Sequence, residues 1–134
     1  MNQIRVAVLG AAGRMGAVVC GAVEAALDLD LVVALDVDDD LTAIAASGAT
    51  VAIDFTVPSA SEANVHALVD SGVHAVVGTS GWDEAAFGRV RDRLASAPGV
   101  GVLIAPNFDL GRRVPRGPAG CVHLVGVVQL DDLR

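Results

Sequence analysis

The chain has 134 residues, a normal length for one domain that can bury a sizeable core. Apolar residues make up 53% and charged residues 19% of the chain, which argues against a disordered protein. The net charge of −7 argues against binding to nucleic acid or to an anionic membrane, because both need basic surfaces.

Three further classes of protein find no support in the sequence. No apolar run approaches the ~20 residues that a membrane helix needs. The first five residues contain no signal-peptide core, and Cys20 and Cys121 have no metal-binding or redox spacing. We therefore expect a cytoplasmic protein with no metal site and no membrane or nucleic-acid partner.

Apolar strands and amphipathic helices alternate along the first 105 residues. The pattern predicts strands at 4–9, 31–35, 50–55, 73–77 and 100–105. It predicts helices at 13–27, 58–71 and 83–94, and a short one that follows the acidic residues 36–40 and ends at Ser47. Strands that are apolar at nearly every position favour a parallel sheet covered on both faces. The fold class predicted is therefore α/β, with a doubly wound parallel sheet of the Rossmann type.

Three glycines at three-residue spacing, Gly10, Gly13 and Gly16, follow the first strand. The first would allow a sharp turn, the second a close approach to a pyrophosphate, and the third the packing of helix on strand. Because the pattern lies between a strand and a helix, it favours a dinucleotide site at the helix N-terminus. A purely structural turn is the alternative.

Asp36 ends the second strand, twenty residues after Gly16, where such folds place the acid that binds the adenosine ribose. The aspartates at positions 38 to 40 would disfavour a 2′-phosphate, so Asp36 and its neighbours favour NADH over NADPH. Arg14, inside the glycine loop, could still reach a 2′-phosphate, which leaves NADPH open. A solvated acidic turn is the alternative interpretation of Asp36.

Three more motifs end the later strands: "IDFT" at 53–56, "GTSG" at 78–81 and "APNF" at 105–108. Asp54 alone is best interpreted as the cap of the helix that Pro58 opens. The small residues after the fourth strand could approach the nicotinamide ribose, or form only a glycine-rich turn. Asn107 offers an amide donor and acceptor beside Phe108.

No catalytic set of side chains appears in the sequence. His66 falls within a predicted helix, His74 at the start of a strand away from the expected site, and His123 in the tail. Trp82 is best interpreted as a packing residue. Because no Ser/His/Asp set, metal-ligand cluster or carboxylate pair is found, hydrolysis and metal catalysis have no support in the sequence.

Together, "GAAGRMG", "IDFT", "VVGTSG" and "LIAPNF" resemble the N-terminal domain of the 4-hydroxy-tetrahydrodipicolinate reductase family of bacterial lysine (diaminopimelate) biosynthesis, over residues 4–111. The resemblance implies that this domain binds NADH or NADPH. It implies pyrophosphate contacts from the glycine loop, namely Gly10, Ala11, Ala12, Gly13, Arg14 and Met15, and an adenosine-ribose contact from Asp36. It implies nicotinamide contacts from Gly78, Thr79, Ser80, Ala105, Pro106, Asn107 and Phe108, with Phe55 and Thr56 forming the channel.

The sequence departs from the family after Gly111. The resemblance implies a long helix there, followed by a substrate domain with a His-His pair, a Lys and a Ser-Gly-Thr loop. Residues 112–134 are instead rich in Arg and Pro and contain none of these motifs. We therefore divide the chain into an NAD(P)-binding domain at 1–111 and an atypical tail at 112–134, and hypothesise a truncated or frame-shifted product.

The function expected from the resemblance is the NAD(P)H-dependent reduction of 4-hydroxy-tetrahydrodipicolinate to tetrahydrodipicolinate. This chain would supply only the cofactor-binding part, so we expect the isolated chain to be inactive. A homo-oligomer like that of the family is not expected without the C-terminal domain. The alternatives are a non-catalytic NAD(P)-binding module and a non-functional fragment.

Overall fold

A five-stranded sheet forms the centre of the computed structural model, which describes residues 3–36, 39–79 and 81–104. The strands are β1 (Ile4–Leu9), β2 (Leu29–Leu35), β3 (Val51–Asp54), β4 (His74–Val77) and β5 (Val102–Ile104). Their order is β2-β1-β3-β4-β5, and every neighbouring pair is parallel. The predicted α/β fold with a doubly wound parallel sheet is confirmed.

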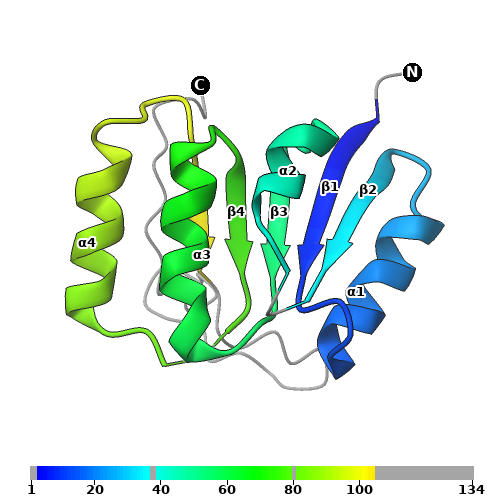
Figure 1. Cartoon of the computed structure of the whole chain (residues 1–134), viewed down its shortest axis with the longest axis horizontal. Helices are drawn as coiled ribbons and strands as arrows, with labels where there is room; N and C mark the ends of the chain where they lie inside the picture. The colour runs from blue at the N-terminus through cyan, green and yellow to red at the C-terminus, as the bar shows by residue number, and fades with distance from the viewer. Residues whose placement is uncertain (1–2, 37–38, 80, 105–134) are drawn as a thin grey trace, which may run out of the picture.

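Four helices connect these strands: α1 (Arg14–Ala25), α2 (Thr42–Ser47), α3 (Pro58–Asp70) and α4 (Glu84–Leu94). None of the helices in the described ranges is long and apolar enough to cross a membrane. In Figure 1 the strands point downward, and α1, α3 and α4 all begin at the lower edge. The carboxyl ends of the strands and three helix N-termini therefore meet at one edge of the sheet.

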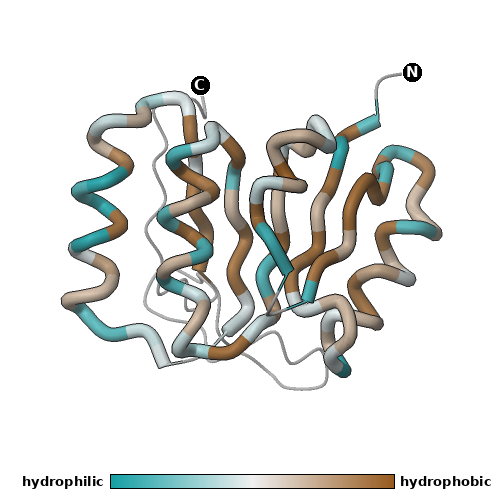
Figure 2. The backbone as a smooth tube through the Cα atoms, viewed as in Figure 1, coloured by the Kyte–Doolittle hydropathy of each residue, from teal (hydrophilic) through white to brown (hydrophobic). Residues whose placement is uncertain are grey.

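The two faces of the sheet bury different side chains, as the alternation along β1 illustrates. Ala7 and Leu9 belong to a core that includes Ile44 of α2 and buried residues of α3 and α4. Val6 and Val8 pack on the other face, against Val23 of α1. Figure 2 shows the matching pattern, with apolar strands inside and mixed polarity along the helices. Helices thus lie on both faces of the sheet, with α1 against β1 and β2 and the other three helices on the opposite face.

The direction of winding changes between β1 and β3. The chain passes from β1 to β2 on one side of this point and from β3 through β4 to β5 on the other. It returns from β2 to β3 through the short α2, and the described part of the chain places no further strand outside β2. In doubly wound sheets ligands bind beyond the carboxyl ends of the strands at such a switch point, which here lies beside Gly10.

Three predicted boundaries are wrong by two residues, and several others by one. The first helix was predicted to end at residue 27, but Ala26 is already extended, with φ −81° and ψ 131°, and β2 begins at Leu29 rather than at residue 31. The last strand was predicted from residue 100 but begins at Val102. The Gly101 carbonyl still accepts from the Ala75 N–H of β4 (3.0 Å), but the Gly101 N–H donates to His74 Nδ1 (3.0 Å) and not to a backbone carbonyl, so the ladder does not continue beyond it.

A close backbone contact joins the end of β1 to α1. Gly10 adopts a φ of +82°, a conformation that favours glycine, and its carbonyl oxygen lies against Gly16. A Cβ atom on Gly16 would overlap this carbonyl, whereas a Cβ on Gly21 of the same helix would meet nothing within 4 Å.

We predict that Gly16→Ala destabilises the domain by about 1–3 kcal/mol, because the backbone must move to accommodate the methyl group. Gly21→Ala is the matched control and should be neutral or stabilising by up to ~1 kcal/mol, since alanine has the higher helix propensity. Urea unfolding followed by circular dichroism measures both free energies. Equal effects of the two substitutions would contradict the contact as described.

Candidate functional site

The register of the sheet brings four of the predicted site residues into one row. Leu9 is paired with Leu35 on one side and with Asp54 on the other, and Asp54 is paired with Val77. The residues that follow these strand ends are therefore neighbours along the carboxyl edge: Asp36, Gly10, Phe55 and Gly78. Backbone bonds extend this alignment by one residue, from Phe55 N–H to Leu9 O and from Gly78 N–H to Asp54 O, both at 2.9 Å.

The glycine loop is closed by its own backbone. The Gly13 N–H donates to the Gly10 carbonyl at 3.0 Å, and Gly13 is the N-cap of α1. No side chain caps this N-terminus, and its first turn contains no acidic residue. Since the first N–H groups of a helix have no acceptor within the helix, the loop offers donors and a positive dipole end to an anion.

Asp36 lies directly beside this loop. The Leu35 carbonyl accepts hydrogen bonds from both Gly10 N–H (2.8 Å) and Ala11 N–H (3.0 Å), which places the next residue of β2 at the loop. Asp36 is exposed, and its N–H donates to Asp39 Oδ2 at 2.8 Å. The sequence spacing therefore placed the glycine loop and this carboxylate correctly on neighbouring strand ends.

Negative charge continues beyond Asp36. Asp39 and Asp40 are both exposed, while position 38 lies outside the described residues. The Thr42 N–H donates to Asp40 Oδ1 at 3.0 Å, and this bond lowers the pKa of the Asp40 carboxyl. A negatively charged turn thus follows the strand end that faces the glycine loop.

Phe55 and Gly78 contact one another across the ends of β3 and β4. A Cβ atom on Gly78 would overlap the Phe55 ring, so the ring packs directly against the glycine backbone. On its other side, the Phe55 carbonyl lies 2.6 Å from where a Cβ on Gly10 would stand. Glycine at both positions therefore lets three strand ends approach closely.

The prediction that Asp54 caps α3 is wrong. The N-cap of α3 is Val57, which has no side-chain cap. The Asp54 carboxylate is fully buried and accepts hydrogen bonds from Thr56 N–H (2.8 Å) and Thr56 Oγ1 (2.6 Å). It turns inward because Ser61 and Asn64 of α3 also donate to it, at 3.1 and 3.4 Å.

The structure adds residues that the sequence analysis missed and leaves others undescribed. Ser61 and Asn64 were missed, although a serine amid the apolar positions of α3 is a signal for a buried polar contact. Trp82 packs as predicted, stacked on Phe87 with ring centroids 5.8 Å apart. Outside the described residues lie Ser80, Ala105, Pro106, Asn107, Phe108, Cys121, His123 and the tail at 112–134.

His66 and His74 lie away from the carboxyl edge, as predicted for His74. His74 begins β4 at the opposite edge of the sheet, and His66 lies in α3 facing α4. Cys20 of α1 is half-buried. Its thiol has a raised pKa, mainly because of desolvation and secondly because of the negative charge of Glu24. Within the described ranges no group of His, Cys, Asp or Glu could hold a metal ion.

Comparison with known proteins identifies the domain. Residues 4–108 match the family described as dihydrodipicolinate reductase, N-terminus. The 4-hydroxy-tetrahydrodipicolinate reductase of Beutenbergia cavernae is 59% identical over 107 residues, which cover 80% of this chain and 43% of that protein. The enzyme of the same name from Streptomyces coelicolor is 50% identical over 111 residues, covering 83% and 44%.

The chain belongs to the dihydrodipicolinate reductase family. It spans less than half the length of the curated relatives it matches. A dipicolinate-bound dihydrodipicolinate reductase from Paenisporosarcina sp. TG-14 has the same fold, with a TM-score of 0.71 at 21% identity over 79% of this chain and 48% of that one. The WlbA dehydrogenase of Bordetella pertussis, in complex with NADH and UDP-GlcNAcA, gives a TM-score of 0.66 at 17% identity over 77% and 37%.

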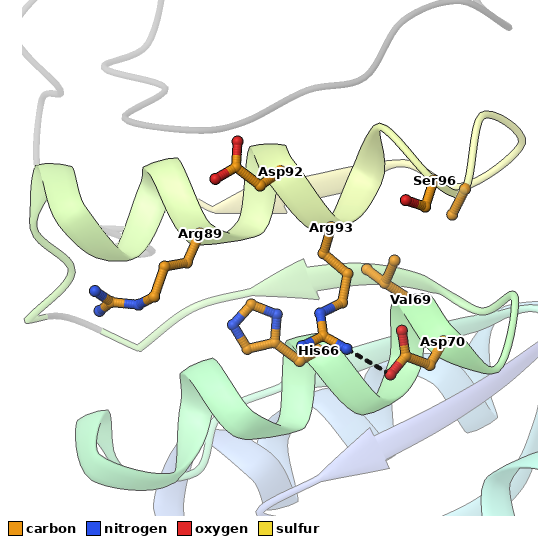
Figure 3. A pocket seen from close by; sticks show the side chains of 8 residues that line it. His66, Val69, Asp70, Arg89, Asp92, Arg93 and Ser96 are labelled. Carbon is orange, nitrogen blue, oxygen red and sulfur yellow. Dashed lines mark hydrogen bonds and ion pairs between the residues drawn. The ribbon is translucent and has the colours of Figure 1, made fainter.

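Away from the carboxyl edge, a groove lies between α3 and α4, with a volume of about 720 Å³ (Figure 3). Arg93 Nη1 bridges the two helices to Asp70 Oδ2 at 2.7 Å. Arg89 donates to both carboxylate oxygens of Glu62, at 2.6 and 2.9 Å, and His66 Nε2 lies 3.0 Å from the same group. The guanidinium groups of Arg89 and Arg93 are therefore both paired with carboxylates of α3. These ion pairs link the two helices, and neither arginine presents an unpaired charge to a ligand in the groove.

The Glu62 ion pair predicts a pH dependence of stability. Hydrogen bonds from Arg89, and secondly from His66, lower the pKa of the Glu62 carboxyl from 4.5 to about 2. A depressed native-state pKa stabilises the fold above the unfolded-state pKa, and this stabilisation declines as the pH falls from 4.5 toward 2.

Glu62→Gln should therefore lower the free energy of unfolding at pH 5, and the deficit should shrink steadily between pH 4.5 and pH 2. Urea titrations across this range measure the difference. Arg89→Met removes the hydrogen bond that contributes most to the lowered pKa of Glu62. In this variant most of the pH-dependent stabilisation by the Glu62 carboxylate should be lost. A deficit that does not change with pH would contradict the pairing.

Proposed function

We propose that the chain binds a nicotinamide dinucleotide across the carboxyl edge of its sheet. One observation carries this proposal: the uncapped N-terminus of α1, closed by Gly10 and Gly13, lies beside the strand-end carboxylate of Asp36. Donors for a pyrophosphate and an acceptor for ribose hydroxyls are thus adjacent, as dinucleotide-binding folds require. Membership of the dihydrodipicolinate reductase family gives the proposal independent support.

The adenosine half would be held by the glycine loop and β2. The loop from Gly10 to Met15 would hold the pyrophosphate, and the Asp36 carboxylate would accept from the adenosine ribose. The donors to the pyrophosphate would be the N–H groups of Ala12, Arg14 and Met15, because those of Gly10, Ala11 and Gly13 already donate to backbone carbonyls that shape the loop. The negative charges of Asp39 and Asp40 would repel a 2′-phosphate, which favours NADH. Arg14 is exposed on the loop and is the cation available to NADPH.

The nicotinamide half would lie along the ends of β3 and β4. Phe55 and Thr56 would form one wall of the channel, and Gly78 and Thr79 would approach the nicotinamide ribose. The packing of the Phe55 ring on Gly78 supports this, since it leaves a glycine backbone at the strand end. Ser80, Ala105, Pro106, Asn107 and Phe108 stay predicted contacts of the same half.

In the whole reductase we propose that the substrate is 4-hydroxy-tetrahydrodipicolinate. When bound, NAD(P)H would supply a hydride from nicotinamide C4 to the ring of this substrate; with one proton added and the 4-hydroxyl group lost as water, the products would be tetrahydrodipicolinate and NAD(P)⁺. The residues of this chain would bind and orient the cofactor, so that its reactive face is presented at the carboxyl edge. The substrate contacts and the proton donor would come from the part of the relatives that this chain does not match.

Calorimetric titration of the purified chain with NADH and with NADPH tests the proposal. We expect saturable binding of both, with the smaller dissociation constant for NADH. Absence of binding of either cofactor at millimolar concentration would reject the proposed function.

Asp36→Ala tests the ribose contact. Loss of a charged acceptor should weaken the binding of NADH about tenfold or more and the binding of NADPH by less, because the 2′-hydroxyl of the adenosine ribose is free only in NADH. Asp28→Ala is the control, since Asp28 is exposed at the opposite end of β2. An equal loss for both cofactors would show that Asp36 does not contact the 2′ position.

A further inference from the structure

A buried chain of hydrogen bonds lies directly behind the proposed nicotinamide site. Asp54, Ser61 and Thr79 are the buried polar side chains among the described residues, and all three belong to this chain. The Trp82 Nε1–H donates to Thr79 Oγ1 at 3.2 Å, Thr79 Oγ1 donates to Ser61 Oγ at 2.8 Å, and Ser61 Oγ donates to Asp54 Oδ2 at 3.1 Å.

The chemistry of its two ends fixes the direction of every bond in this chain. The indole N–H of Trp82 can only donate, and the Asp54 carboxylate, which accepts from four donors, is the acceptor at the other end. Each hydroxyl between them has one proton, so Thr79 and Ser61 must each accept from one side and donate to the other. One arrangement of the hydroxyl protons therefore satisfies the whole chain.

This chain of hydrogen bonds connects the segments after β3 and β4 to one group, the Asp54 carboxylate. Asp54 Oδ1 holds the turn after β3 through the N–H and hydroxyl of Thr56, while Asp54 Oδ2 holds Ser61 of α3. Ser61 in turn fixes Thr79, the second residue after β4. Thr56 and Thr79, one on each side of the proposed nicotinamide channel, are thus held at a set separation by residues outside it.

Burial of these polar groups stabilises the fold only weakly. A buried carboxylate and two buried hydroxyls lose their water, and their mutual hydrogen bonds largely offset that loss without much net gain. A fully satisfied polar network also fixes the positions of its side chains, because any other arrangement of them leaves a buried polar group without a partner. The location of the network, behind two loops of the site, indicates where that geometry is used.

We propose that Ser61 is a positioning residue for the cofactor: through Thr79 it sets the segment after β4 against the nicotinamide half and leaves the adenosine half unaffected. This inference rests on the proposed function. Ser61 is fully buried in α3 and acts through Thr79, whereas the glycine loop and Asp36 lie on β1, α1 and β2.

The test compares two ligands that differ by the nicotinamide riboside. NADH occupies both halves of the proposed site, and ADP carries only the adenosine and the diphosphate. Ser61→Ala in the 134-residue chain removes the hydrogen bonds of Ser61 to Thr79 and to Asp54. It should raise the dissociation constant for NADH about tenfold and change that for ADP by less than about twofold.

Ser47→Ala is the matched control, because it removes a serine hydroxyl that bonds to Ile44 O at 2.6 Å in α2, away from both loops. It should leave both dissociation constants within about twofold. Trp82 is the single tryptophan of the chain, so its fluorescence reports independently whether the network is altered in each variant.

If Ser61→Ala does not fold, Trp82→Phe replaces it, because phenylalanine keeps the stacking on Phe87 and removes the first donor. A smaller loss of NADH affinity, with ADP binding unchanged, is then expected. Equal changes for NADH and ADP, or no change for either, would overturn the positioning role. Failure of the native chain to bind both ligands would overturn the proposed function, and this inference with it.

Discussion

The contact between the Gly10 carbonyl and Gly16 is the constraint on which the rest of this edge depends. It holds the first turn of α1 against the end of β1, which is possible because Gly16 has no Cβ atom and Gly10 adopts a φ of +82°. The same turn brings Gly10 against the Phe55 carbonyl of β3. An uncapped helix N-terminus, an acidic strand end and an aromatic wall are thereby gathered at the point where the winding of the sheet changes direction.

Much of the fold could be predicted from the sequence because hydrophobic pattern and turn residues agree along the chain. Apolar strands between helices fixed the parallel sheet, and Pro58 marked the first position of α3. The boundaries that were wrong depend on partners distant in the sequence. The side chain of His74 takes the Gly101 N–H and shortens β5, and no local pattern near residue 101 encodes this bond.

The candidate site divides in the same way. The glycine loop and Asp36 were predictable because their spacing follows from a strand–helix–strand unit, whose geometry the backbone sets. Asp54 was misinterpreted as a helix cap because its carboxylate could accept either from the backbone at the start of α3 or from side chains buried between α3 and β3. Only the packing of α3 against β3 decides between these two sets of donors. Ser61 donates from that packed helix, so its role depends on tertiary contacts that a linear sequence does not display.

The central claim is that the carboxyl edge, and not the groove between α3 and α4, holds the dinucleotide. Titration of the ¹⁵N-labelled chain with NADH, followed by amide chemical shifts, tests it most directly. The account predicts that the largest changes fall on the glycine loop, from Gly10 to Met15, and on Gly78 and Thr79. Largest changes around His66 and Arg93, or none at saturating cofactor, would contradict it.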